Sequence, residues 1–196
     1  MDFSISPRIE ALRREIAAFV AEEILPLEAA PTSYDAHENI ALETLQRLRV
    51  KARDKGLWCL QLPEEFGGRN IGRVGMAVCY EEMNRSIFGP VVFNSAAPDD
   101  GNMMVMAELG TAEQQEWWLR PVAEGKVRSA FAMTEPAPGA GSDPSMLRTR
   151  ATYRAGRWLI SGVKWFITGA EESAHFILIA RTSDDPRTGF SGYVDH

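Results

Sequence analysis

The sequence predicts an α+β fold in which a helical N-terminal domain is followed by a domain of β-strands. Up to about Val127 the apolar residues recur at helical spacing, and beyond that point they fall in short alternating runs. The helices precede the strands instead of alternating with them, which argues against a doubly wound parallel sheet. We therefore expect an all-α domain at residues 1–127 and a β domain at residues 128–196.

Length and composition restrict the class of protein. The chain has 196 residues, of which 45% are hydrophobic and 24% charged, as in a globular domain. Its net charge of −6 argues against nucleic acid as a partner. No apolar run approaches the roughly 18 residues of a membrane span, and no secretory signal is visible, so we expect a cytoplasmic protein. Cys59 and Cys79 are expected to be buried free thiols.

Six helical segments are predicted in the first domain. They are residues 7–29, 40–55, 73–88, 91–98, 99–109 and 111–125. Ser6-Pro7 is a helix start, and Pro26 predicts a bend in the first helix. The positions expected to face the core on the second and third helices are Leu42, Leu45, Leu48 and Ala52, then Val74, Ala77, Val78, Tyr80 and Met83.

Five short strands are predicted in the second domain. They are residues 129–134, 149–153, 157–161, 164–168 and 176–180, all rich in β-branched and aromatic residues. Ala155-Gly156 predicts a hairpin turn between the second and third of them. If residues 164–168 alternate as a strand, Trp165 faces the opposite side of the sheet from Phe166 and serves packing.

The stretch from Phe131 to Asp143 lies close to the change from helices to strands and contains prolines and glycines at close spacing. Its glycines let the backbone pass close to a bulky group. Ser142-Asp143-Pro144 resembles the start of a helical turn, which favours an anion such as phosphate. The alternative is an ordinary loop between domains, and these residues alone leave both interpretations open.

Several segments, in order, together resemble the acyl-CoA dehydrogenase family over nearly the whole chain. They are Phe19–Pro26, Gly56-Leu57 with Leu62–Gly68, Glu81-Glu82-Met83, Gly110–Gln115 with Leu119–Pro121, Ala132–Pro136 with Gly141-Ser142-Asp143, and Gly162–Gly169. The last two are similar to that family's flavin-contacting signatures. One departure is the length of the segment from Pro136 to Ala140, which has five residues where the family usually has three.

The resemblance implies an oxidoreductase of fatty acid metabolism that binds FAD and dehydrogenates an acyl-CoA thioester between its α and β carbons. An electron-transfer flavoprotein is a typical electron acceptor. By the same resemblance, the cofactor-binding residues are Phe131, Met133, Thr134, Gly141, Ser142, Phe166, Ile167 and Thr168, and Ser142 also lies near the pantetheine of the substrate. The hydroxyl of Thr134 would donate to the pyrimidine end of the flavin and that of Thr168 near N5.

No catalytic residue is predicted within these 196 residues. Glu135 is interpreted as structural, because the resemblance places the catalytic base in a C-terminal helical domain that the sequence lacks. We therefore expect the β domain to be antiparallel, barrel-like and incomplete, and this truncated chain to be inactive alone. The full-length protein is expected to form a homo-oligomer.

Other interpretations remain open at this point. An oxidase of the same fold would share these residues, and a non-catalytic binding or regulatory fragment is a third possibility. Taken singly, Met133 and Ile167 fit core strand positions, and Thr134 and Thr168 fit ordinary strand threonines. His37, His175 and His196 lack metal-ligand spacing and are expected at the surface or at hinges. Trp117-Trp118 is expected to pack within its helix.

Overall fold

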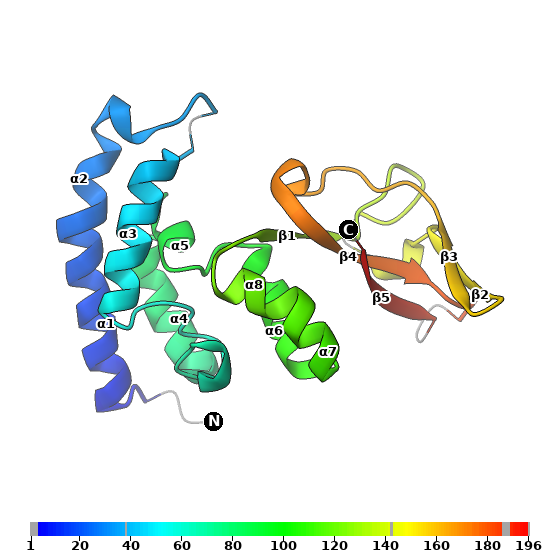
Figure 1. The fold of residues 1–196 in the computed structure, drawn as a ribbon, viewed down its shortest axis with the longest axis horizontal. Coiled ribbons are helices and arrows are strands. Elements are labelled where there is room, and N and C mark those ends of the chain that lie inside the picture. The colour runs from blue at the N-terminus through cyan, green and yellow to red at the C-terminus, as the bar shows by residue number, and fades with distance from the viewer. Residues whose placement is uncertain (1–3, 38, 142, 186–188, 196) are drawn as a thin grey trace. The chain divides into compact units, whose positions relative to one another are not determined.

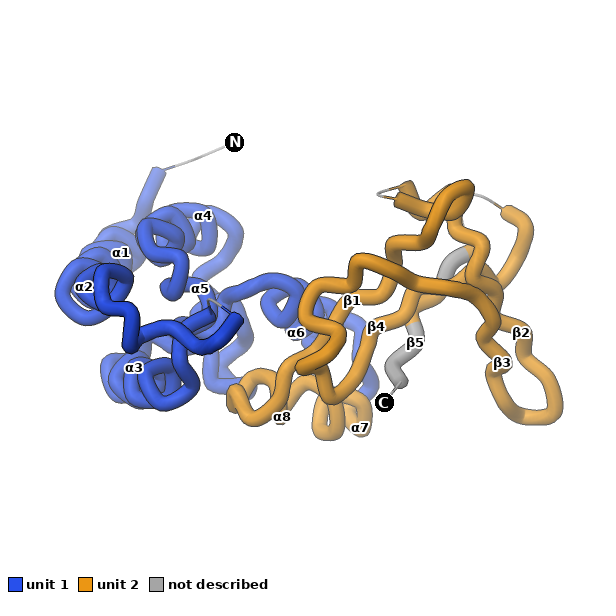
Figure 2. The backbone as a smooth tube through the Cα atoms, turned by 90° about the horizontal axis from the view of Figure 1, so that it is seen from above, with its two compact units in different colours: residues 1–111 blue, residues 112–196 orange. Residues whose placement is uncertain are grey.

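The structure is a computed structural model that describes residues 4–37, 39–141, 143–185 and 189–195. Figure 1 labels the helices and strands, and Figure 2 colours the two compact units into which the chain divides. The first unit is Met1–Thr111 and the second is Ala112–His196. All named strands lie in the second unit, so the predicted order of helices before strands is confirmed.

The first long helix follows the predicted span. It consists of α1 (Pro7–Phe19), a π-helical turn η1 (Val20–Ile24) and α2 (Leu25–Glu28). The hydroxyl of Ser6 accepts a hydrogen bond from the backbone N–H of Ile9 and caps its N-terminus. Pro26 has no N–H to donate, and its ring crowds the preceding turn. The widened turn directly before it removes that conflict, so the irregularity lies one turn earlier than predicted.

Of the remaining helices of this unit, the one at residues 99–109 matches its predicted span, and the others are shorter than predicted. They are α3 (Leu42–Asp54), α4 (Gly72–Met83), α5 (Gly89–Val92) and α6 (Asp99–Leu109), with 3₁₀ turns η2 (Pro31–Ser33) and η3 (Glu64–Phe66). α4 ends at Met83 because the side-chain amide of Asn84 donates to the carbonyl of Tyr80 at 2.8 Å. The predicted helix 91–98 is wrong beyond Phe93, because Asn94 has a φ of 57° and cannot continue a helix.

The core of the first unit is formed by helix faces that differ partly from the predicted ones. Leu48 and Ala52 of α3 are buried as expected, but Leu42 is 66% exposed. On α4 the buried positions are Gly75, Cys79, Glu82 and Met83. Gly75 explains the shift, because a Cβ there would lie 3.0 Å from Cδ1 of Ile9 on α1. The close approach of α1 rotates the buried face of α4 away from Val74, which is exposed.

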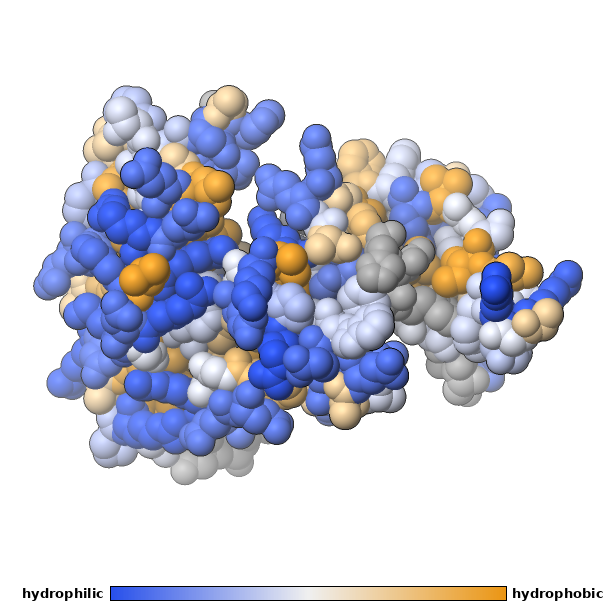
Figure 3. All heavy atoms as spheres, in the orientation of Figure 1, coloured by the Kyte–Doolittle hydropathy of each residue, from blue (hydrophilic) through white to orange (hydrophobic). Residues whose placement is uncertain are grey.

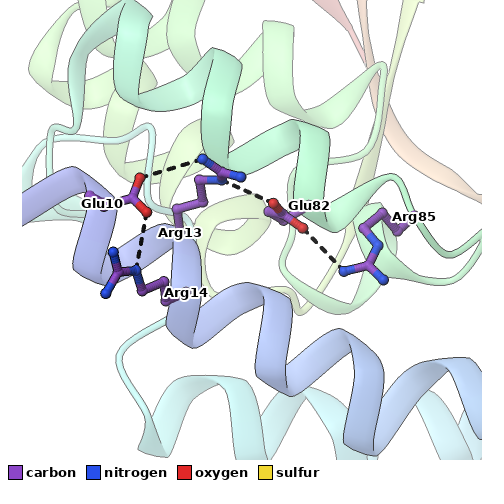
Figure 4. Close-up of polar contacts among 5 residues, drawn as sticks. All are labelled: Glu10, Arg13, Arg14, Glu82 and Arg85. Carbon is purple, nitrogen blue, oxygen red and sulfur yellow. Dashed lines mark hydrogen bonds and ion pairs between the residues drawn. The ribbon is translucent and has the colours of Figure 1, made fainter. Parts of the chain in front are cut away.

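A polar network crosses from α1 to α4 (Figure 4). Nε of Arg13 lies 3.0 Å from Oε1 of Glu82, whose other oxygen lies 3.3 Å from Nη1 of Arg85. Glu10 pairs with both Arg13 and Arg14 on α1. The side chain of Glu82 is only 11% exposed, and the hydrogen bond from Arg13 lowers its pKa. The network therefore holds α1 against α4 through one nearly buried carboxylate.

The cysteines are buried and free in the structure, as the sequence predicted. Burial raises the pKa of the Cys59 thiol to about 12 and that of Cys79 to about 11. Both therefore remain protonated, and neither thiol is poised for nucleophilic chemistry. The described residues contain no cluster of His, Cys, Asp or Glu side chains that could hold a metal ion.

The second unit begins with a helix that matches the predicted span 111–125. It comprises α7 (Ala112–Gln114), the π-helical turn η4 (Gln115–Leu119) and α8 (Arg120–Ala123). The widened turn again directly precedes an X-Pro sequence, Arg120-Pro121, as it does before Pro26. Gly125, with a φ of 67°, ends the helical path.

The second unit then forms a five-stranded sheet. Its strands are β1 (Arg128–Ala132), β2 (Arg150–Arg154), β3 (Arg157–Ser161), β4 (Ser173–Arg181) and β5 (Phe190–Asp195). β4 pairs in parallel with β1 and, at its end, with β2, and antiparallel with β5, while β2 and β3 pair antiparallel. The expectation of an antiparallel, barrel-like domain is therefore corrected, because this sheet is mixed and open. The 40 residues between β1 and β4 are long enough to bring the chain back in the same direction.

The predicted strand at residues 164–168 is wrong. Residues 162–167 have no regular structure, and Phe166 has a φ of 50°, which no extended strand contains. The left-handed residue breaks the alternation, so the rings of Trp165 and Phe166 lie together, with centroids 4.8 Å apart. Trp165 is 43% exposed and does not serve core packing. β5, in contrast, was not predicted.

The predicted hairpin is present, whereas the expectations for the tryptophans and histidines are met only in part. Ala155 and Gly156 both have positive φ and join β2 to β3 as predicted, in the type I′ manner. Trp117 packs edge-on against Trp118 of the same helix, with ring centroids 6.4 Å apart, but stays 63% exposed. Trp118 also lies against His175 with ring centroids 5.3 Å apart. His175 is buried on β4, contrary to prediction, because Trp118 covers it. His37 is exposed as expected, and His196 lies outside the described residues.

Candidate functional site

Two segments that are distant in sequence lie side by side in the second unit. The ammonium group of Lys164 donates to the carbonyl of Met133 at 2.7 Å and to Oε1 of Glu135 at 2.9 Å. The backbone N–H of Trp165 donates to the carbonyl of Thr134 at 3.1 Å. These bonds join the chain just after β1 to the irregular segment 162–168. The structure therefore brings together the two stretches that carry most of the predicted site residues.

Glu135 is committed to this junction and is unsuited to act as a base. Its carboxylate accepts hydrogen bonds from the backbone N–H groups of Arg148 at 2.7 Å and Thr149 at 2.9 Å, in addition to Lys164. Burial alone would raise its pKa, but the hydrogen bonds from Thr149, Lys164 and Arg148 outweigh burial and lower the pKa to about 2. Such a carboxylate is a weak proton acceptor, which agrees with its interpretation as structural.

The five residues from Pro136 to Ala140 form a closed turn. The backbone N–H of Glu135 donates to the carbonyl of Ala140 at 2.6 Å, and that of Gly139 donates to the carbonyl of Pro136 at 2.8 Å. A Cβ at Gly139 would lie 2.6 Å from Oε2 of Glu135, so the turn requires glycine there. The turn therefore accommodates five residues, two more than the acyl-CoA dehydrogenase family usually has, next to Glu135.

The predicted site residues of the first segment differ in exposure. Phe131 lies on β1 and is 36% exposed, while Met133 and Thr134 are half-buried. Gly141 is exposed, and a Cβ built on it would meet no atom within 4 Å. The space around Gly141 is therefore open to a bound group. Ser142 lies outside the described residues.

The helical turn predicted at Ser142-Asp143-Pro144 exists as η5 (Pro144–Met146), but Asp143 caps it. Its carboxylate accepts from the backbone N–H of Ser145 at 2.9 Å. A three-residue turn has little dipole, and its cap already supplies a negative group. The structure therefore gives no support to the expected anion site.

The second segment holds Phe166, Ile167 and Thr168. Phe166 is 83% exposed, Ile167 is half-buried and Thr168 is exposed. A bulky residue in the left-handed region, as Phe166 is, costs roughly 1–3 kcal/mol, and such residues cluster at functional sites. Among the residues that the structure describes, the hydroxyl groups of Thr134 and Thr168 have no hydrogen-bond partner.

Large apolar side chains are exposed on the second unit, and Figure 3 shows hydrophobic side chains over its sheet. The set consists of Trp117, Phe131, Met146, Tyr153, Trp158, Leu159, Ile160, Val163, Trp165 and Phe166. Side chains of this kind can cover the face of an apolar ligand or contact another protein surface.

These features fit the isoalloxazine ring of FAD. A flat aromatic ring with polar atoms along one edge needs apolar cover for its faces and hydrogen-bond donors at its edge. Phe131, Phe166 and Ile167 can provide the first, and the unpartnered hydroxyls of Thr134 and Thr168 can provide the second. No observation in the described residues conflicts with such a ligand at this junction.

Lys164, which the sequence analysis did not single out, lies at this junction and bonds to Met133 and Glu135. It stands between Val163 and Trp165, in a segment interpreted as an ordinary strand. A signal was present, because a lysine within an apolar run needs a partner when it is buried, and Glu135 ends the other segment. Its side chain is 10% exposed and that of Glu135 is 3% exposed.

Comparison with known proteins shows the family of the chain. The family models for the acyl-CoA dehydrogenase N-terminal domain and middle domain match residues 6–126 and 130–194, respectively. The chain therefore belongs to the acyl-CoA dehydrogenase family.

Individual relatives show the same likeness. The chain is 35% identical over 191 residues to the probable acyl-CoA dehydrogenase FadE2 of Mycobacterium tuberculosis, covering 95% of this chain and 46% of that protein. It is 31% identical over 196 residues to (R)-benzylsuccinyl-CoA dehydrogenase of Thauera aromatica, covering 96% and 48%. A solved structure from Mycobacterium abscessus, named for the same family, matches with a TM-score of 0.87 and 33% identity, covering 97% and 50%.

The chain thus spans about half the length of these two curated relatives. Within the described residues, no helix is both long and apolar enough to cross a membrane.

Proposed function

We propose that this chain provides the flavin-facing part of an FAD-dependent acyl-CoA dehydrogenase. The reaction is the α,β-dehydrogenation of an acyl-CoA thioester, with electrons leaving to an acceptor such as an electron-transfer flavoprotein. The observation that carries the proposal is the junction of the Thr134 and Thr168 segments, with unpartnered hydroxyl donors beside exposed apolar side chains. Family membership and the names of the relatives support it.

Each group of this chain has a role in the proposal. Bound FAD would supply the hydride acceptor for the β carbon. The hydroxyl groups of Thr134 and Thr168 donate hydrogen bonds where the reduced ring gathers negative charge, in the manner of an oxyanion hole. Phe131, Met133 and Phe166 with Ile167 cover apolar ring surface and exclude water.

Two further assignments belong to the same proposal. Gly141 and Ser142 allow the phosphate-bearing part of the cofactor and the pantetheine of the substrate to approach the backbone. The helical domain, residues 1–127, and the β domain, residues 128–196, remain the proposed functional division.

The proton acceptor for the α carbon is not Glu135 in this proposal. Its oxygens are engaged and its pKa lies at about 2. Loss of a positioned general base costs typically 10²–10⁴-fold in rate. The 196-residue chain is therefore expected to bind FAD without turning over acyl-CoA at enzymatic rates.

The test combines a flavin titration with an activity assay. The purified chain is titrated with FAD, saturated, and mixed with acyl-CoA thioesters of several chain lengths and an artificial electron acceptor. We expect a shifted flavin absorption spectrum and turnover well below about 1 s⁻¹. Failure to bind FAD would contradict the flavin site and favour a non-catalytic module. Rapid turnover would place a base within these residues, and oxygen consumption without an acceptor would identify an oxidase.

A further inference from the structure

We propose that Lys164 is a positioning residue for the flavin site, acting through Met133 and Glu135. This inference rests on the proposed function. Lys164 touches neither substrate nor cofactor in the proposal. It determines how the Thr134 segment and the Thr168 segment lie against each other.

Hydrogen bonds connect Lys164 and Trp165 to the segment that holds Thr134. Three consecutive residues, Met133, Thr134 and Glu135, are each bonded to Lys164 or Trp165. Two of these three bonds come from the single ammonium group of Lys164. If that group is removed, one direct hydrogen bond between the two segments remains among the described residues. It is the bond from the backbone N–H of Trp165 to the carbonyl of Thr134.

The side chains of Lys164 and Glu135 are both nearly buried. A buried lysine is costly unless its charge is compensated, and Glu135 supplies the compensating charge. Burial lowers the pKa of Lys164, while the hydrogen bond that Lys164 donates to Glu135 opposes that shift. A pair retained at this cost, bonded to the residues on either side of Thr134, suggests a role beyond the folding of the sheet.

The positive charge of Lys164 also affects the electrostatic potential at the proposed flavin site. Lys164 donates to the carbonyl of Met133 and the carboxylate of Glu135, and so compensates one partial and one full negative charge next to the proposed ring edge. Without it, these groups would repel the negative charge that the reduced ring gathers. Loss of Lys164 should therefore lower the flavin reduction potential as well as weaken binding.

The experiment compares three variants with the unaltered chain. Lys164→Met removes both bonds, Lys164→Arg keeps the charge and the donors, and the double variant Glu135→Gln/Lys164→Met removes the buried charges together. Lys126→Met is the matched control, because Lys126 is 71% exposed in the same unit. The measurements are the FAD dissociation constant, the reduction potential of bound flavin, thermal unfolding, and hydrogen exchange of the Trp165 amide without flavin.

In Lys164→Met we expect the FAD dissociation constant to rise about 10- to 100-fold, as for lost hydrogen bonds to charged groups. The potential should fall and the Trp165 amide should exchange faster. Lys164→Arg should restore most of the affinity and protection. The double variant should recover part of the thermal stability lost in Lys164→Met, because no buried charge is left unpaired, but it should not recover FAD affinity, which separates positioning from general stability.

Two results would overturn the inference. One is an Lys164→Met variant that folds and keeps the affinity, the potential and the Trp165 protection of the unaltered chain. The other is a double variant that recovers FAD affinity along with stability. If the unaltered chain binds no FAD, the proposed function fails with the inference, whereas normal binding by both proteins contradicts only the inference.

Discussion

The backbone N–H of Trp165 donates to the carbonyl of Thr134 at 3.1 Å, across 30 intervening residues of chain. This bond lies one residue from Phe166, whose left-handed conformation turns the following residues out of any strand. The proposed flavin donors, Thr134 and Thr168, are therefore held by an irregular junction instead of by a sheet ladder. The expected consequences of this arrangement can be measured one group at a time.

Replacement of either threonine should weaken flavin binding without unfolding the chain. Thr134→Val and Thr168→Val remove a hydroxyl and keep the side-chain shape. A lost hydrogen bond to a charge-gathering group is worth roughly 1.5–3 kcal/mol, so FAD affinity should fall at least about tenfold. Thr152→Val on β2 is the control, since Thr152 is an exposed strand threonine outside the junction. Equal FAD affinity in all three variants would refute the assignment of these donors.

The two glycines of the loop should respond differently to alanine. Gly139→Ala should destabilise the chain, because its Cβ would lie 2.6 Å from Glu135 Oε2 and 2.9 Å from the carbonyl of Pro136. Gly141→Ala should fold normally, because its Cβ meets nothing within 4 Å, yet it should bind FAD less well if the cofactor passes there. Thermal unfolding and flavin titration of both variants test this difference. A Gly141→Ala variant with unchanged FAD affinity would remove Gly141 from the site.

Glu135 should make stability depend on pH in a defined window. Its pKa is lowered from 4.5 to about 2, so its contribution is present above pH 4.5 and is lost as the pH falls toward 2. Each pKa unit is worth about 1.4 kcal/mol, which gives roughly 3 kcal/mol in total. Urea unfolding of the unaltered chain and Glu135→Gln should show a difference that narrows by about 2 kcal/mol from pH 6 to pH 3.

The control for this prediction is Glu116→Gln. Glu116 is 61% exposed and pairs with Arg120 at the surface. That variant should show almost no difference from the unaltered chain at either pH. A pH-independent difference for Glu135→Gln would mean that Glu135 is not held ionised by its hydrogen bonds.

In the first unit, the neighbouring residues Glu81 and Glu82 should contribute very differently to thermal stability. Glu82 accepts from Arg13 and Arg85 and is nearly buried, whereas Glu81 is exposed (Figure 4). Glu82→Gln should lower the melting temperature by about 3–10 °C, from the loss of hydrogen bonds between charged groups. Glu81→Gln should leave it within about 1 °C. Similar melting temperatures for the two variants would show that the α1–α4 network contributes little.

Much of the fold could be predicted from the sequence because its signals are local. Ser6-Pro7, Gly56 and Gly125 mark helix ends through their own conformational preferences, and Ala155-Gly156 specifies a hairpin without help from the rest of the chain. Helical spacing likewise depends only on neighbours in sequence. These elements were predicted correctly for that reason.

The features that could not be predicted from the sequence depend on contacts between residues that are distant along the chain. No local pattern reveals that α1 comes within contact distance of Gly75 and so shifts the buried face of α4. Phe166 occupies a left-handed conformation that its residue type disfavours, and bonds from distant residues stabilise it. The parallel pairing of β1 with β4 depends on the path of a 40-residue connection. The site residues came from family resemblance, and the structure adds Lys164, whose role depends on a partner 29 residues away.

A crystal structure of the chain with bound FAD is the most direct test of the central claim. The account predicts the pyrimidine end of the isoalloxazine at the junction of the two segments, with the hydroxyl groups of Thr134 and Thr168 within about 3.2 Å of ring heteroatoms. Lys164 should remain bonded to Met133 and Glu135 in that complex. A flavin bound elsewhere, or bound with both hydroxyl groups turned away from the ring, would contradict the account.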